Sequence, residues 1–157
     1  MELLSEIKIN RSSGDAVLQL FHGDMSAIPP EHAVDIMIVS AYPNNYDPLP
    51  GTLIGALYNK GLNFANLAQH KQVDLTTQLG CCLSYELPVQ LQQQFNTKRF
   101  VSFEPRILSH KPEEVVSNVF RCLNNFLIPD IETSETKMQQ PALDISTIAM
   151  PMLATGN

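Results

Sequence analysis

Apolar and polar positions divide the chain into segments with three different patterns. An uninterrupted apolar run at residues 36–39 predicts a strand buried on both faces, because a half-exposed strand alternates apolar and polar side chains. Residues 6–10 alternate, and residues 16–21 form a second apolar stretch after a Ser-Ser-Gly-Asp turn signal. These two segments predict an antiparallel hairpin at a sheet edge. Between residues 112 and 127 apolar side chains recur at helical spacing, which predicts a helix with one face in the core.

That helical stripe is interpreted as core and is given no chemistry. It consists of Val115, Val116, Val119, Phe120, Leu123, Phe126 and Leu127. Weaker patterns predict strands at 81–87, 99–104 and 147–156, the last of them buried, and a short helix at 64–68.

The central segment combines the features that an α/β fold uses to hold an anion. The strand at 36–39 leads through Ser40 and Ala41 into a loop rich in Pro and Gly, which ends where Thr52 favours a helix start. At such a helix start the backbone N–H groups are unpaired and the helix dipole favours negative charge. The fold class predicted is therefore α/β, with a ligand site at the carboxyl ends of the strands.

Length and composition predict a single domain over residues 1–157, with residues 128–146 as a flexible connection rich in polar residues. The net charge of −6 argues against a nucleic-acid partner held by a broad basic face. The start of the chain has no secretory pattern and no apolar run reaches membrane-spanning length, so a cytoplasmic location without membrane contact is expected.

The three cysteines, Cys81, Cys82 and Cys122, do not predict a disulfide framework, and free thiols in a reducing compartment are expected. The four histidines are scattered, so no metal site is predicted. No cofactor is expected either.

Three stretches stand out in this order: His22-Gly23-Asp24-Met25-Ser26, the segment 34–57, and the segment 148–156, Ile-Ala-Met-Pro-Met-Leu-Ala-Thr-Gly. Together they resemble the macrodomain family of ADP-ribose-binding modules. In the family they correspond to a Gly-Asp-Ile-Thr-like turn, a strand ending in Asn-Ala-Ala-Asn before a glycine-rich loop and helix, and an Ile-Ala-Phe-Pro-Ala-Ile-Ser-Thr-Gly strand. The resemblance implies a three-layer α/β/α domain with a mixed sheet, preceded by the N-terminal antiparallel hairpin.

The resemblance also implies a binding site for ADP-ribose or a related NAD-derived nucleotide along the carboxyl rim of the sheet. By analogy Asp24 accepts a hydrogen bond from the adenine amino group, and the Met25 amide meets the ring. The full set of implied ligand-binding residues is Asp24, Met25, Ser40, Ala41, Gly51, Thr52, Leu53, Ile54, Gly55, Ala154, Thr155, Gly156 and Asn157. Without the resemblance, Asp24 is read as the cap of a short helical turn, and Gly51 and Gly55 as residues for a turn and for close helix packing.

The sequence departs from the family pattern where hydrolytic members place their asparagine. Ser40-Ala41-Tyr42-Pro43 stands in place of Asn-Ala-Ala-Asn, and Asn44 and Asn45 are displaced beyond it. The flexible glycines are replaced by Asp47-Pro48-Leu49-Pro50-Gly51, which adds a carboxylate that would repel phosphate. The leading prediction is therefore ligand binding with little or no catalysis. If the chain is an enzyme, it is an ADP-ribosyl hydrolase with Asn44 or Asn45 ordering the ribose.

A third reading is a degenerate domain kept for protein–protein contact, with an apolar patch of Tyr42, Tyr46, Leu49 and Leu53. Macrodomains continue past the third stretch through a helix and one more strand inside the sheet. The resemblance therefore implies a chain incomplete at its C-terminal end, with neighbouring domains in a longer protein and two strand edges free to pair. Its other expected partner is an ADP-ribosylated protein.

Overall fold

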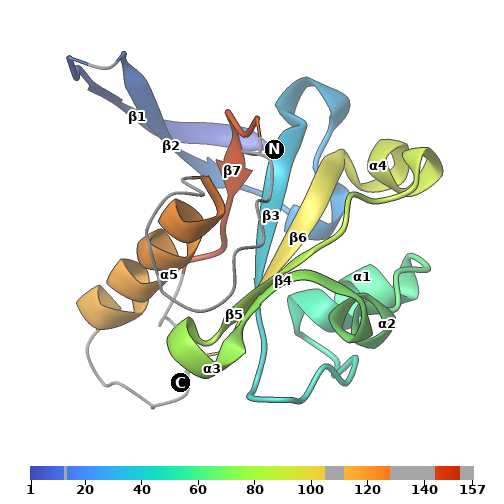
Figure 1. Cartoon of the computed structure of the whole chain (residues 1–157). Coiled ribbons are helices and arrows are strands. Elements are labelled where there is room, and N and C mark those ends of the chain that lie inside the picture. Colours follow the sequence, from blue (N-terminus) through green and yellow to red (C-terminus); the bar gives the residue numbers. More distant parts are fainter. Residues whose placement is uncertain (13, 105–111, 128–143, 153–157) are drawn as a thin grey trace.

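The computed structural model describes residues 1–12, 14–104, 112–127 and 144–152 (Figure 1). They form a mixed α/β protein, with a two-stranded antiparallel N-terminal hairpin, a five-stranded mixed sheet and several helices. The strands are β1 (Glu2–Ile9), β2 (Ala16–His22), β3 (Val34–Ser40), β4 (Lys71–Leu75), β5 (Cys81–Ser84), β6 (Thr97–Phe103) and β7 (Ile148–Ala149). The helices are η1 (Met25–Ala27), η2 (Pro30–His32), α1 (Leu53–Asn59), α2 (Phe64–Gln69), α3 (Thr76–Leu79), α4 (Val89–Phe95) and α5 (Pro112–Leu127).

The five-stranded sheet has the order β4-β5-β6-β3-β7. The three strands β6, β3 and β7 are parallel, so their carboxyl ends point the same way, whereas β5 runs antiparallel to β6 and to β4. The centre of β3 is fully buried from Ile36 to Val39, as its continuous apolar run predicts. This strand therefore anchors the sheet.

Helices cover both faces of this sheet (Figure 1). On one face Met37, Val39 and Phe100 pack with the buried side chains of α1, α2 and α4. On the other face Ile36, Ile38 and Val101 pack with Val119 and Leu123 of α5. Alternate residues of β3 thus belong to two separate apolar clusters, one on each side of the sheet.

The helix predicted over residues 112–127 is confirmed, but its apolar stripe needs a correction. Phe120 is exposed, while Val119 and Leu123 are buried as expected, together with Cys122. Val116 is half-buried, and the side chains of Val115, Phe126 and Leu127 lie outside the part of the structure that is described. The buried face of α5 is therefore centred on Val119, Cys122 and Leu123, and Phe120 lies outside it.

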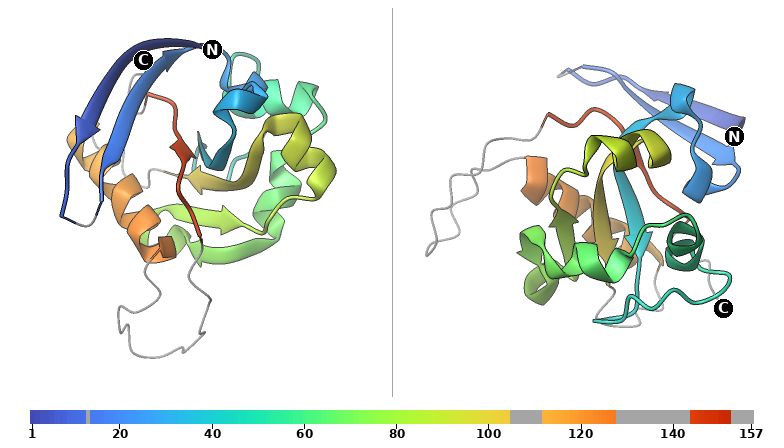
Figure 2. Two further views of the ribbon diagram at one scale, coloured as in Figure 1. Left: turned by 90° about the horizontal axis from the view of Figure 1, so that it is seen from above. Right: turned by 90° about the vertical axis from the view of Figure 1, so that its right-hand side faces the viewer.

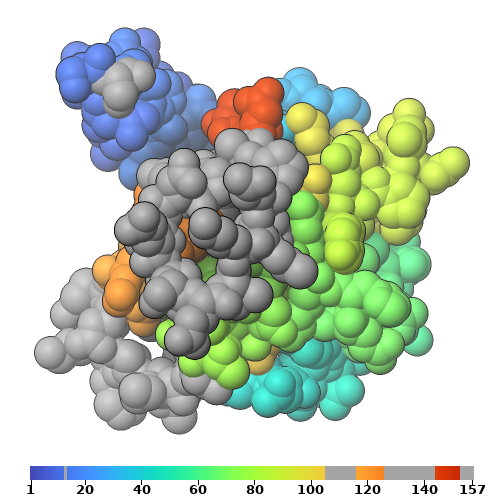
Figure 3. Space-filling view, in the orientation of Figure 1, coloured from blue at the N-terminus to red at the C-terminus, as the bar shows by residue number. Residues whose placement is uncertain are grey.

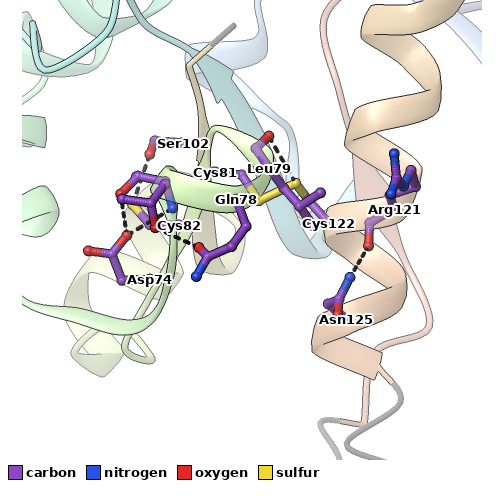
Figure 4. Close-up of a disulfide and its surroundings, with 11 residues drawn as sticks. Asp74, Gln78, Leu79, Cys81, Cys82, Ser102, Arg121, Cys122 and Asn125 are labelled. Carbon is purple, nitrogen blue, oxygen red and sulfur yellow. Dashed lines mark hydrogen bonds between the residues drawn. A yellow bond between two sulfur atoms is a disulfide. The ribbon is translucent and has the colours of Figure 1, made fainter. Parts of the chain in front are cut away.

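The expectation of free thiols is wrong for two of the three cysteines. Cys81 of β5 and Cys122 of α5 form a disulfide, with their Cα atoms 6.6 Å apart (Figure 4). Cys82 is free and buried, and burial raises the pKa of its thiol. The sequence separation of 41 residues hid the pair, since only the packing of α5 on β5 brings the two side chains together. Because disulfides are typical of oxidising compartments, the cytoplasmic location stays only a prediction.

The sequence patterns predicted the remaining strands and helices only in part. The strand predicted over 147–156 is limited to Ile148–Ala149 among the described residues, and Ile148 is exposed rather than buried, because β3 is the only strand beside β7 there. The sequence patterns missed β4, α3 and α4. The flexible connection predicted for 128–146 lies outside the described residues except for residues 144–146.

The N-terminal hairpin forms as predicted but does not extend the edge of the large sheet. In the described structure β1 and β2 make a two-stranded sheet of their own. It projects from the body of the molecule (Figures 2 and 3). Among the described residues, no helix is both long and apolar enough to span a membrane.

Candidate functional site

The carboxyl end of the β3–β6 pair is where the structure gathers most of the candidate residues. Ser40 ends β3 and is exposed, and the Ala41 N–H extends the pairing by donating to the Phe103 carbonyl at 2.9 Å. Met25 of η1 and Leu53 and Ile54 of α1 pack into the same apolar cluster as Ala41. Segments 24–25, 40–41 and 53–54 therefore border the same face of the sheet.

Asp24 caps η1. Its Oδ1 atom accepts hydrogen bonds from the Ser26 N–H at 2.8 Å and the Ser26 hydroxyl at 2.7 Å, and its Oδ2 atom lies 3.2 Å from Lys60 Nζ. The Ser26 hydroxyl, followed by the Ser26 N–H and Lys60, lowers the pKa of Asp24 despite its partial burial. The side chain stays 60% exposed, so the ionised carboxylate has lone pairs available to an external donor. Capping and ligand contact are thus compatible.

Asp24 and the loop that contains Gly51 lie at opposite ends of α1, because Asp24 pairs with Lys60. Lys60 is the residue that follows the last turn of α1, whereas Gly51 and Thr52 precede its first turn. The helix has seven residues and is about 10 Å long. A ligand that touched both groups of candidate residues would have to be elongated.

The loop before α1 is held close to the first turn of the helix. The Thr52 hydroxyl accepts from the Gly55 N–H at 3.0 Å and donates to the Leu49 carbonyl at 2.7 Å. This one hydroxyl group therefore both caps the helix and closes the loop. A Cβ atom on Gly55 would lie 2.2 Å from the Leu49 carbonyl oxygen, which no side chain tolerates. Gly51 has a φ of +80°, a conformation that favours glycine. Both glycines therefore have packing and turn roles in the structure.

The remaining amides of this loop have a different status. Among the described residues, the N–H groups of Gly51, Leu53 and Ile54 have no hydrogen-bond acceptor. Asp47 precedes these residues in the same loop, and its carboxylate would repel an anion. It is exposed and has no ion-pair partner in the described part of the chain.

Glu104 is a feature of this rim that the sequence patterns did not single out. It follows β6, is buried, and accepts hydrogen bonds from the Asn44 N–H at 2.9 Å and from the Tyr46 hydroxyl. Burial, followed by the hydrogen bond to Glu104, raises the pKa of Tyr46. The ring of Tyr46 also packs near Phe64 of α2, with centroids 5.9 Å apart. Glu104 thus ties the loop after β3 to the end of β6.

The two asparagines proposed for catalysis lie in this tied loop. Asn44 has a left-handed φ of 55°, and its exposed side chain has no hydrogen-bond partner among the described residues. The side chain of Asn45 accepts the Asp47 N–H at 2.9 Å, and its own N–H donates to the Tyr42 carbonyl. Asn45 is therefore used in a local turn, whereas the side-chain amide of Asn44 is free to contact a ligand.

The apolar patch proposed for protein contact is only half present. Tyr42 and Leu49 are exposed, at 68% and 46%. Tyr46 and Leu53 instead pack against the core cluster of that face. The candidates Ala154, Thr155, Gly156 and Asn157 lie outside the described residues.

The opposite end of the same strand pair has its own carboxylate. Asp35 of β3 accepts hydrogen bonds from the N–H and hydroxyl groups of Ser146 and Thr147 at 2.8–3.0 Å, and forms an ion pair with Lys98 at 2.7 Å. Burial raises the pKa of Asp35, but the bonds from Lys98, Ser146 and Thr147 outweigh it and bring the pKa well below its usual range. These donors join the segment before β7 to β3.

A hollow of about 410 Å³ lies at that amino end, between α4 and the first residues of β3 and β6. Val34, Gln92 and Lys98 are among its walls, and Asp35 and Lys98 neutralise each other there. None of the ligand-binding residues implied by the sequence is among its lining residues. The described residues contain no cluster of three or more His, Cys, Asp or Glu side chains suited to a metal ion.

Comparison with known proteins gives no assignment: no protein-family model, curated protein or solved structure matches this chain.

Proposed function

We propose that this protein is a divergent macrodomain-like module, a three-layer α/β/α domain that binds ADP-ribose or a related NAD-derived nucleotide. The ligand would lie along the carboxyl rim of the sheet, over the end of β3 and beside η1 and α1. The observation that carries the proposal is the convergence of Met25, Ala41 and Ile54 in one cluster. Three segments distant in the sequence thereby border one face of the sheet, and the loop after β3 begins at its carboxyl end, where open α/β sheets bind ligands.

The chemistry of the rim suits a nucleotide with two separated polar parts. The exposed Asp24 carboxylate is an acceptor for an exocyclic amino group. About one length of α1 away, the unpaired amides of Gly51, Leu53 and Ile54 are donors for a pyrophosphate. Lys60, beside Asp24, supplies a cation at that end of the ligand.

Little or no turnover is proposed. Of the two displaced asparagines, only Asn44 has a side chain free for a ligand, and Asn45 is held by the Asp47 N–H. Among the described residues, no Ser, Cys or Thr at the rim has a histidine within hydrogen-bond distance to act as its base. The same rim would accept ADP-ribose attached to a protein, since one end of an elongated ligand is free to extend beyond it.

Isothermal titration calorimetry with ADP-ribose, NAD and AMP tests the proposal. Heat is expected with ADP-ribose, and Asp24→Asn should weaken binding about tenfold because the loss of a charged acceptor costs roughly 1.5 kcal/mol. Absence of heat with all three nucleotides would remove the proposal.

The chain offers a matched control in Asp74. Its carboxylate accepts from the Thr76 N–H and hydroxyl and pairs with Lys71 at 3.0 Å, which reproduces the local environment of Asp24. Asp74 lies in β4, the edge strand opposite β7, and two strands separate β4 from β3. Asp74→Asn should therefore leave the affinity unchanged. Equal weakening by both variants would show a structural effect and not a ligand contact.

The alternative functions give different results in the same samples. Release of ADP-ribose from an ADP-ribosylated protein, lost in Asn44→Ala, would show a hydrolase. Exposed Tyr42 and Leu49 are the observation that favours protein contact. A chain that binds no nucleotide but binds a partner protein, and loses it in a Tyr42→Ser, Leu49→Ser double variant, would support that reading.

A further inference from the structure

The N-terminal hairpin is the least covered part of the described chain. All eight residues of β1 are exposed, and the hairpin stands away from the body (Figure 3). An isolated two-stranded hairpin is marginally stable in water, and three or more strands are needed for a stable sheet. The hairpin therefore has a reason to acquire another strand.

One face of the hairpin is apolar, and the other carries Glu6, Lys8 and Gln19 together with Val17. The register pairs Ile7 with Leu18, and Ser5 with Leu20, on the first face. Its large apolar side chains, Ile7, Ile9, Leu18 and Leu20, are between 43% and 57% exposed. On the other face Glu6 accepts a hydrogen bond from Gln19 at 2.8 Å and lies 3.9 Å from Lys8.

The outer edge of β1 is free in the described structure, because β2 is its only neighbour (Figure 2). A bulge between Leu3 and Ser5 interrupts the ladder, which leaves Ser5–Ile9 as the regular stretch of the strand. Ile7 is the middle residue of this stretch. An antiparallel pairing of the stretch with itself therefore has its two-fold axis at Ile7.

We propose that β1 of one chain pairs antiparallel with β1 of a second copy, about a two-fold axis at Ile7, to form a four-stranded sheet. In this register Glu6 of each chain is opposite Lys8 of the other, and Ser5 is opposite Ile9. Directly opposite residues share a face, so the charges complement each other on the polar face and Ile7 meets its own copy on the apolar face.

The charges select this register over its neighbours. An axis at Glu6 would place the two Glu6 carboxylates opposite each other, and an axis at Lys8 would do the same to the two ammonium groups. Like charges directly opposite destabilise a sheet. An axis between residues would pair apolar with charged positions and mix the two faces.

Sedimentation velocity of the whole chain over a range of concentrations tests this interface. We expect a reversible dimer. Glu6→Lys or Lys8→Glu should each raise its dissociation constant about tenfold, because two attractive cross-strand pairs become repulsive. Glu2→Lys, the same charge change outside the regular stretch, should leave the dimer as strong as before.

Mixing separates a register effect from damage to the hairpin. Equal amounts of the Glu6→Lys and Lys8→Glu chains should form a mixed dimer of wild-type strength, since each pair across the axis again has opposite charges. The Glu6→Lys, Lys8→Glu double variant should self-associate normally for the same reason. A wild-type chain that is monomeric throughout, or a dimer indifferent to the two charge changes, would overturn the proposal, as would a mixture that stays dissociated.

Discussion

The two ends of the β3–β6 strand pair each hold a neighbouring segment with one carboxylate, but they do so differently. At the amino end Asp35 accepts from four N–H and hydroxyl groups and pairs with Lys98. At the carboxyl end buried Glu104 accepts from one N–H and the Tyr46 hydroxyl, and no cation pairs with it among the described residues.

The difference separates a structural carboxylate from one at a candidate site. Asp35 is fully compensated and fixes the segment before β7 to the centre of the sheet. Glu104 has few donors for a buried carboxylate, and it lies at the rim where the ligand is proposed. Its two donors belong to the loop that carries Asn44, so the shape of this loop depends on a small number of bonds.

The largest expected effect is at the amino end. Asp35→Asn should lower the free energy of unfolding by about 3 kcal/mol, because four hydrogen-bond donors and one cation lose a charged acceptor. Urea denaturation followed by circular dichroism measures this change. The exposed Asp15→Asn variant is the control and should unfold like the wild type.

The same variant has a pH signature. The folded pKa of Asp35 is below its ordinary value of 3.8, so its contribution to stability is present above pH 3.8 and is lost as the pH falls further. The wild type should therefore lose stability more steeply in acid than Asp35→Asn. Parallel acid curves for the two proteins would contradict the assignment.

A smaller effect is expected at the carboxyl end. Tyr46→Phe should cost about 2 kcal/mol, since a hydrogen bond to a buried carboxylate is lost. The folded pKa of Tyr46 is above the ordinary value of 10.0, so its contribution is present below pH 10.0 and is lost as the pH rises beyond it. Chemical denaturation at neutral and alkaline pH measures both effects.

Tyr58→Phe is the matched control for this variant, because Tyr58 is exposed and loses the same hydroxyl group. If both variants cost the same, or if Tyr46→Phe keeps the alkaline dependence of the wild type, the bond to Glu104 does not stabilise the loop.

The smallest effect is expected from Lys98→Met. The ammonium group of Lys98 is exposed, and Asp35 keeps its four other donors. The variant should raise the pKa of the Asp35 carboxyl toward 3.8 and change the stability at neutral pH only slightly. A carboxyl NMR titration measures the shift. An unchanged titration would leave the N–H and hydroxyl donors as the whole cause of the low pKa.

Local patterns were sufficient where one segment carried its own signal. The continuous apolar run predicted β3, alternation around a turn predicted the hairpin, and Thr52 before a Leu-rich segment predicted the start of α1. The pattern failed at α4, because Gln side chains fill most of Val89–Phe95 and only Phe95 is buried. It also misplaced Phe120, since helical spacing alone does not show which face is bonded to β5.

The candidate site was predictable in its parts and not in its connections. The sequence by itself determined the buried central strand, the loop and the helix that follows, because these depend on contacts between near neighbours. Only the tertiary structure decided that Glu104 holds Tyr46, 58 residues away, that Asp35 holds Thr147, 112 residues away, and that Cys81 bonds to Cys122. Such pairs depend on strand order and helix packing, which bring together side chains whose separation along the chain carries no periodic signal.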